Sequence, residues 1–559
     1  MSQGGVRDYP GVAHSINQPN YQFEVDSDDE DYVDEFAEHL PIDLAINVEQ
    51  QRLFAEECMA KAGGFGRFQW LACIFLVMGV NCSALITQCL YLLEMEPKYE
   101  CQLDGGEQWT SCTPEQFCGD NFKPNGIPYQ IDYTQDESLD NWFNHLHLEC
   151  EQFQTKGQYS ISLFQISFFS GIVLGMLLFP LIADKSGRKV VFFMGVALHL
   201  MLVLCTLVVN EAQWFYCIVF LMGIEQPARM IIGYIYLSEF CTETGKQRPL
   251  MTSIANFLVA QSATLCVIYF TLVSKHWIYF ELAGGVGLSL LSLTGVCWIP
   301  ESPRWLIAQG RYTKALKVYK RIAKINGKTF SNMVFQLSKT QADREVASQL
   351  ASDPNLWVAN GGTLKELIHA QNNEAQPHHI SSLLKGRPRL PEFKDIFVGP
   401  EKAFLASKYI IVGFTWAVYM YCFYVMEAFL QYTVGDDYVD QLTIANAEAF
   451  GYLLSGWLFV KHQNIGKKIL CYSLLSSSVL CALMLSIHSE PSTREGGIFV
   501  ALIIMLIRMC LAMTFNILLL VTNLLGSKIA FCVATLIAGL VSGTMLEETR
   551  RPLGEQLKR

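Results

Sequence analysis

The sequence predicts an all-α integral membrane protein in which about eleven transmembrane helices form two bundles. Its 559 residues are 51% apolar and have a mean hydropathy of +0.25, which is too apolar for a soluble chain of this length. A helix crosses the bilayer core with about 20 apolar residues. Stretches of this kind lie at about 69–93, 160–182, 190–209, 214–238, 250–273, 277–299, 408–431, 442–460, 469–487, 497–521 and 525–546.

Charge and polarity divide the chain into five parts. Residues 1–50 hold twelve acidic residues and one basic residue, which accounts for the whole net charge of −11 and predicts a disordered cytosolic tail. The expected parts are the tail at 1–52, a six-span bundle at 53–300 with an outer loop at 94–156, a cytosolic linker with amphipathic helices at 301–405, a second bundle of about five spans at 406–546, and a polar tail at 547–559.

Loop charges predict which side of the membrane each loop occupies. Lysine and arginine follow the second, fourth, sixth and eighth spans, whereas the loop at 94–156 holds thirteen acidic residues against three lysines. Because basic loops stay on the cytoplasmic side, we expect the N-terminus inside. The basic stretch 311–323 has the pattern of an amphipathic helix that lies along the inner membrane surface.

The outer loop contains an even number of cysteines in a polar segment. This pattern is typical of disulfides in an oxidising space, and the alternative is four free thiols in an internal compartment. The loop has no usable glycosylation sequon, because the only one, Asn81-Cys82-Ser83, lies inside the first span. The plasma membrane is favoured and an internal organelle membrane stays open. The disulfide candidates are Cys101, Cys112, Cys118 and Cys150.

Charged motifs follow the apolar spans of the first half. Ala183–Lys189 (ADKSGRK) comes after the second span and Pro300–Leu306 (PESPRWL) after the sixth. Glu239 ends the fourth span and Arg248 begins the fifth. A carboxylate at such a position can accept hydrogen bonds from the N-terminus of a facing helix.

These motifs resemble those of the organic cation/anion transporter family of the major facilitator superfamily, over about Gly64 to Glu555. The resemblance implies a transporter fold of two helix bundles that rock around a midplane site. It also implies that the charged motifs gate the inner side. The gating residues it suggests are Asp184, Gly187, Arg188, Lys189, Glu239, Arg248, Glu301 and Arg304.

The same resemblance suggests residues that line a central cavity. Aromatic faces attract organic cations, although each aromatic side chain is alternatively part of the packed core. Glu225 and Arg229 lie one helical turn apart in the fourth span, so they either contact substrate or neutralise each other. The expected substrate-binding residues are Trp416, Phe423, Tyr424, Glu427, Glu448, Phe257, Glu225 and Arg229.

The chain departs from the family after about Asn523. Leu524–Lys528 leads directly into Ile529–Met545, and Glu547–Glu555 resembles the end of the family's sequences, so the eleventh span is expected to be absent. Either the protein lacks this span or the sequence omits it. An eleven-span chain would place its basic C-terminal residues outside, against the charge rule. It would also leave a gap in the second bundle, open to lipid or to a partner protein.

The function expected from these features is secondary transport of small organic ions. Cations or zwitterions are favoured, because Glu427 and Glu448 stay unbalanced if Glu225 pairs with Arg229 and if Arg508 is structural. The alternative is a transport-inactive member that serves as a receptor or as a structural subunit of a membrane assembly.

Enzymatic functions are not expected. The sequence lacks a phosphate loop, a nucleophile elbow and a His/Cys cluster with metal-ligand spacing. We therefore expect no cofactor, no metal and no nucleic-acid partner. The expected partners are a small organic ion and the lipid bilayer.

Overall fold

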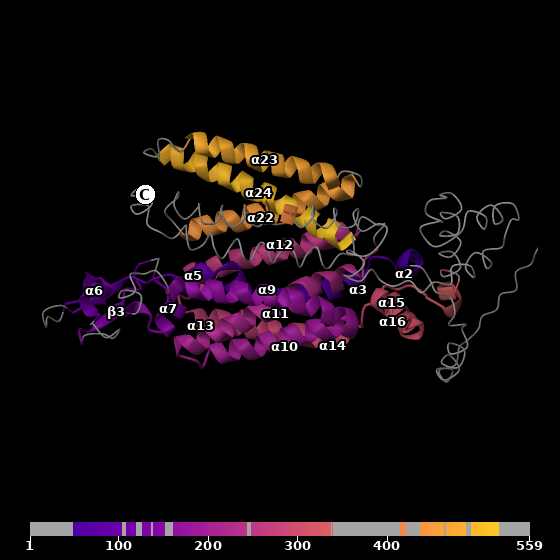
Figure 1. Ribbon diagram of the computed structural model, residues 1–559, viewed down its shortest axis with the longest axis horizontal. Helices are drawn as coiled ribbons and strands as arrows, with labels where there is room; N and C mark the ends of the chain where they lie inside the picture. The colour runs from indigo at the N-terminus through magenta and orange to yellow at the C-terminus, as the bar shows by residue number, and fades with distance from the viewer. Residues whose placement is uncertain are drawn as a thin grey trace, which may run out of the picture. The chain divides into compact units, whose positions relative to one another are not determined.

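The computed structural model describes residues 48–102, 108–118, 126–135, 138–150, 160–242, 247–336, 338, 414–416, 418–419, 422, 437–462, 466–487 and 494–524 (Figure 1). The expectations for the acidic tail, for most of the linker and for the last span with its gap lie outside these residues. So do three predicted substrate-binding residues, Phe423, Tyr424 and Glu427.

Long helices of the first half pack side by side in one bundle (Figure 1). The helices Ser160–Ser186 and Ala212–Ser238 approach closely because Gly175 of the first faces the backbone of the second. An added Cβ at Gly175 would lie 2.0 Å from the carbonyl oxygen of Ile224. The long helices are α9 (Ser160–Ser186), α10 (Arg188–Thr206), α11 (Ala212–Ser238), α12 (Gln247–Ile268) with η2 (Tyr269–Val273), and the composite of α13 (Trp277–Phe280), η3 (Glu281–Gly287) and α14 (Leu288–Trp298).

The predicted first span is not one continuous helix. It consists of α3 (Arg67–Asn81), α4 (Ala84–Gln88) and α5 (Leu90–Glu94), with breaks at Cys82–Ser83 and at Cys89. Helix ends inside a membrane need hydrogen-bond partners for their exposed backbone groups.

Within the described part of the chain, six helices are long and apolar enough to cross a membrane. Five belong to the first half and match predicted spans two to six; the sixth matches the predicted tenth span. These helices cover Leu163–Ser186, Arg188–Thr206, Ala212–Ser238, Gln247–Val273, Trp277–Trp298 and Leu502–Leu519.

The second half contributes α22 (Asp437–Lys461), α23 (Gly466–Ile487) and α24 (Arg494–Leu524). Helix α24 packs against both α22 and α23, and α22 packs against α12 of the first half (Figure 1). The backbone of α22 comes close to α12 at Gly456, where a Cβ would lie 2.2 Å from Ser253 Oγ. The two halves therefore meet along α12 and α22.

The described part of the outer loop is a small cross-linked domain. Strands β1 (Tyr99–Cys101), β2 (Thr110–Cys112) and β3 (Tyr129–Ile131) form an antiparallel sheet of order β2-β1-β3, flanked by α6 (Pro114–Phe117) and α7 (Trp142–His145). Phe117 stacks on Tyr129 with ring centroids 4.3 Å apart. The cysteines pair as Cys101–Cys112 and Cys118–Cys150.

Three helices near the inner ends of the spans pack on one another. They are α2 (Val48–Lys61), α15 (Pro303–Ala308) and α16 (Tyr312–Ile325). The apolar stripe of α16 is buried in the same core cluster as Phe54 of α2, and Tyr319 donates a hydrogen bond to the carbonyl of Ala55. The amphipathic helix predicted at 311–323 is thus present, and its apolar stripe packs against the apolar face of α2.

Candidate functional site

Arg188, the first residue of α10, joins the inner ends of three helices. Its Nη1 donates to Asp184 Oδ1 at 3.1 Å, and its Nε donates to Glu239 Oε1 at 3.1 Å. The Asp184 side chain is 42% exposed and the Glu239 side chain only 14%, so the pair with Glu239 is the less solvent-screened of the two. These contacts bring together three of the predicted gating residues.

Glu301 caps the N-terminus of α10 from a distant part of the chain. Its Oε1 accepts backbone N–H groups from Arg188 at 3.0 Å, Lys189 at 3.1 Å and Ser302 at 2.9 Å. The N-cap residue, Gly187, has no side chain of its own, and its φ of +100° suits glycine. A Cβ there would lie 2.3 Å from Glu301 Oε2, so the glycine leaves room for the carboxylate.

Burial raises the pKa of Glu301, while the backbone N–H groups that it accepts oppose this shift. Next to it, Lys189 Nζ donates to the carbonyls of Cys297 at 3.1 Å and Ile299 at 2.7 Å, at the end of α14. Trp305 Nε1 donates to the carbonyl of Asp184 at 3.0 Å. The inner ends of α9, α10, α11 and α14 are thus tied together with α15.

Two further predicted gating residues, Arg304 and Arg248, form contacts in a neighbouring part of the inner face. Arg304 pairs with Glu56 of α2 and donates to the carbonyl of Cys241 at 2.7 Å. Arg248 Nη2 donates to Ser238 Oγ at 3.4 Å. These contacts connect α2 and α15 with the turn between α11 and α12.

Glu225 and Arg229 form an ion pair in the interior of the first bundle. Arg229 Nε lies 2.5 Å from Glu225 Oε2, and its Nη2 lies 2.6 Å from Oε1. His199 of α10 joins them, with Nδ1 2.8 Å from Glu225 Oε1. All three side chains are at most 1% exposed.

Arg229 also supplies partners for the end of α3. Its Nη1 donates to the carbonyls of Gly79 at 3.1 Å and Val80 at 3.4 Å, and to Ser83 Oγ at 3.1 Å. These are the groups left exposed where the first span breaks. The contacts of Arg229 therefore fit a structural ion pair, the second of the two alternatives; direct contact with a substrate stays a prediction.

In the second half, Trp416 lies in an aromatic cluster. Its ring is 5.5 Å from Phe515 and 6.0 Å from Tyr419, centroid to centroid, and it is fully buried. Phe257 of α12 packs against the same core. The described residues thus bring Trp416 and Phe257 into one cluster that spans both halves.

Glu448 does not carry an unbalanced charge. Arg508 Nη1 lies 3.2 Å from Glu448 Oε1, and both side chains are buried. The expectation that Glu448 stays unbalanced is therefore wrong, because Arg508, taken as purely structural, supplies its counter-charge from α24. The count of carboxylates also omitted Glu281, which lies in the sixth span.

A buried polar cluster joins the halves where α12, α22 and α24 meet. Asn516 Nδ2 donates to Ser253 Oγ at 2.7 Å and to Ser455 Oγ at 2.8 Å. Asn256 donates to Asn516 Oδ1 at 3.0 Å. Such hydrogen bonds fix the position of the two bundles relative to each other where α12, α22 and α24 meet.

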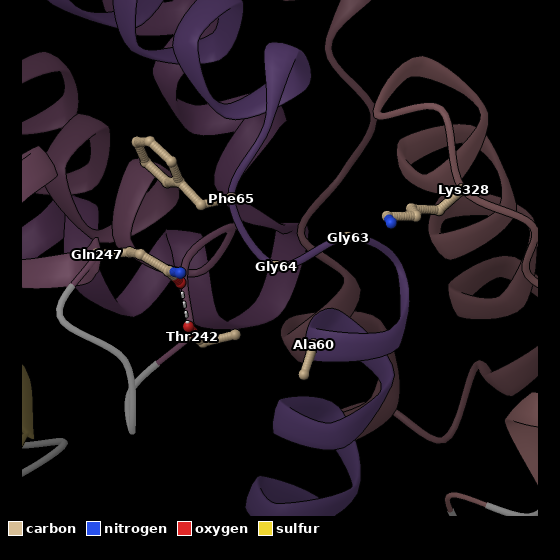
Figure 2. A pocket seen from close by; sticks show the side chains of 7 residues that line it. All are labelled: Ala60, Gly63, Gly64, Phe65, Thr242, Gln247 and Lys328. Carbon is tan, nitrogen blue, oxygen red and sulfur yellow. Dashed lines mark hydrogen bonds between the residues drawn. The ribbon is translucent and has the colours of Figure 1, made fainter.

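An open cleft lies beside the turn between α2 and α3 (Figure 2). Thr242 donates a hydrogen bond to Gln247 Oε1 at 2.7 Å across one side of it, and Lys328 lies on the other (Figure 2). None of the predicted substrate-binding residues lines this cleft. Its lining residues are Ala60, Gly63, Gly64, Phe65, Thr242, Gln247 and Lys328.

Comparison with known proteins identifies the domain. Residues 137–371 match the sugar (and other) transporter family model. The fold resembles the xylose symporter XylE of E. coli with a TM-score of 0.50 at 13% identity, covering 85% of this chain and 86% of that one. The fold of this chain is therefore similar to that of XylE, a transporter of the major facilitator superfamily. This result confirms the fold predicted from the charged motifs.

Relatives with similar sequences carry the name of the predicted family. The chain is 29% identical to organic cation transporter 1 of Caenorhabditis elegans over 286 residues, 47% of each protein. It is 30% identical to solute carrier family 22 member 2 of Rattus norvegicus over 169 residues, 30% of each. The matches span about half of these relatives or less. Both relatives are named as transporters.

Metal ligation was not expected, and the described residues contain no group of three His, Cys, Asp or Glu side chains that could hold an ion. Two ionisable residues within the first bundle, His199 and Glu281, were not among the predicted site residues. Their presence in apolar spans was the signal that could have found them, because ionisable residues in spans pair with one another.

Proposed function

We propose that the protein is a secondary membrane transporter of small organic ions that works by alternating access, with organic cations favoured. The main support is the ion-paired cluster around Arg188 at the inner ends of the first-half helices. In a two-bundle transporter, such a cluster stiffens one bundle so that it moves as a unit against the other.

The preference for cations is supported by the names of the relatives and by the aromatic cluster around Trp416. It no longer draws on Glu448, whose charge Arg508 balances. In our proposal Trp416, Phe257 and the predicted Phe423, Tyr424 and Glu427 contribute to the substrate site.

The relatives and the oxidised pairing of the outer cysteines also support a location in the plasma membrane. The alternative role as a receptor or structural subunit has no support from the relatives, so we do not propose it. A partner protein that covers the second bundle stays a prediction.

The test is uptake of radiolabelled tetraethylammonium by cells that express the full chain. We expect saturable uptake that excess unlabelled substrate abolishes. An Arg188→Ala variant should reach the cell surface, measured by surface biotinylation, and lose most uptake. Uptake no greater than in empty cells, for tetraethylammonium, carnitine and para-aminohippurate alike and with normal surface expression, would refute the proposal.

A further inference from the structure

The hydrogen-bond geometry of His199 fixes its protonation. Its Nε2 lies 3.2 Å from the backbone carbonyl of Cys82, which can only accept. Its Nδ1 lies 2.8 Å from Glu225 Oε1. A neutral imidazole has one N–H group and can serve only one of these acceptors.

Glu225 cannot supply the missing proton. Both of its oxygens accept from the guanidinium of Arg229, at 2.5 Å and 2.6 Å, so it is a carboxylate. Both nitrogens of His199 must therefore donate, and the ring is an imidazolium. Arg229 and His199 carry two positive charges against one negative charge on Glu225, which leaves one positive charge in the interior of a membrane bundle.

Glu281 is the carboxyl group that can balance this charge. It begins the π-helical segment η3, which packs against α10, the helix of His199. An added Cβ at Gly285 would lie 2.7 Å from Glu281 Oε1 and 3.2 Å from Cγ1 of Val203 on α10, so the carboxyl group lies beside that helix. Glu281 is 7% exposed to solvent. Within the part of the chain that the structure describes, its side chain forms no hydrogen bond or ion pair.

In the described part of the chain, several helices contribute titratable groups near this cluster. The helices around it contribute His199 from α10, Glu225 and Arg229 from α11, and the thiols of Cys82 and Cys266. An ionised Glu281 makes the four charged side chains neutral in sum. A proton from solvent on Glu281 restores the excess positive charge of the cluster, and its release to solvent removes that charge again.

We propose that Glu281, beside the imidazolium of His199, forms a proton-binding site in the first bundle, in which Glu281 takes up a proton from water and releases it to water. Glu281 lies four residues after the start of α13, so it is about 6 Å along the helix from the end that carries the disulfide-bonded domain. Solvent at that end is the nearest source of the proton. The site does not depend on the proposed transport activity.

The experiment is an infrared pH titration of the purified full chain in lipid nanodiscs. As the pH rises, the wild type should lose the absorption band of a buried protonated carboxyl group. Glu281→Gln, which keeps the size of the side chain, should remove this band. The matched control Glu211→Gln, at an exposed residue before α11, should keep it.

A second variant tests the partnership with His199. His199→Gln removes a positive charge near Glu281, so the midpoint of the band should rise by about one pH unit, a tenfold gain in proton affinity. A Glu281→Gln titration identical to the wild type would overturn the site, and so would an unchanged midpoint in His199→Gln. Either result leaves the transport proposal standing. Conversely, an intact Glu281 band in a protein without uptake would support the site and refute transport.

Discussion

Glu301 offers the sharpest test of how the inner cluster is held together. Glu301→Ala removes one carboxylate oxygen that accepts three backbone N–H groups, at 2.9 to 3.1 Å. Two of these groups belong to the first turn of α10, which has no other side-chain cap from its N-cap residue. The substitution therefore leaves donors without a partner at a half-buried helix end.

The expected loss follows from these three bonds. A hydrogen bond to a charged group contributes roughly 1.5 kcal/mol or more, and water reaches part of this site, so we expect Glu301→Ala to cost about 3 kcal/mol. Glu301→Gln keeps an acceptor oxygen. Because burial raises the pKa of Glu301, the charge itself is costly, and its removal offsets part of the weaker bonding. We expect Glu301→Gln to cost less than about 1 kcal/mol.

The assay is thermal unfolding of the purified protein, followed by fluorescence. At about 2 °C per kcal/mol for a large chain, Glu301→Ala should lower Tm by about 6 °C and Glu301→Gln by no more than about 2 °C. The folded state holds the Glu301 proton more tightly than the unfolded chain, so wild-type stability should fall as pH rises through the raised pKa, and Glu301→Gln should lack this fall. Equal losses in both variants would refute the capping role.

Four further outcomes follow from the same geometry. Gly187→Ala should destabilise the protein by about 2 to 3 kcal/mol in thermal unfolding, whereas Gly310→Ala, also at positive φ but with nothing within 4 Å of its Cβ, should cost only about 1 kcal/mol. Glu225→Gln leaves buried positive charges unbalanced and should cost about 3 to 5 kcal/mol, measured as Tm; a wild-type Tm would contradict the ion pair. Glu239→Gln should lower tetraethylammonium uptake by roughly tenfold, and the more exposed Asp184→Asn by about threefold or less, so the reverse order would count against the gate geometry. Mass mapping without reduction should recover two cross-linked pairs rather than four alkylated thiols, namely Cys101–Cys112 and Cys118–Cys150.

Much of the fold could be predicted because membrane spans are a local property of the sequence. A run of about 20 apolar residues must be helical in lipid, whatever its neighbours are. The inner motifs were equally local: Asp184 and Arg188 are four residues apart in the sequence, and they pair in the structure. The break of the first span at Cys82 was not predictable, because the carbonyls of Gly79 and Val80, which the break exposes, accept hydrogen bonds from Arg229 of another helix.

The partners of buried charges lie beyond this local information. Glu448 and Arg508 are separated by 60 residues, and His199 and Glu225 by 26, so no helical periodicity connects them. The same holds for Glu301, which caps a helix that begins 113 residues earlier in the chain. Glu448 was expected to be unbalanced because its counter-charge, Arg508, comes from a different helix, α24.

By itself, the sequence determined where the helices cross the bilayer and which of their ends carry charge. These features follow from the transfer of each segment from water to lipid, which every span undergoes on its own. Only the tertiary structure decided which buried charge meets which. The lipid-facing and protein-facing sides of a span are similarly apolar, so the choice of neighbours depends on small-residue contacts such as Gly175 against α11 and on polar contacts between helices.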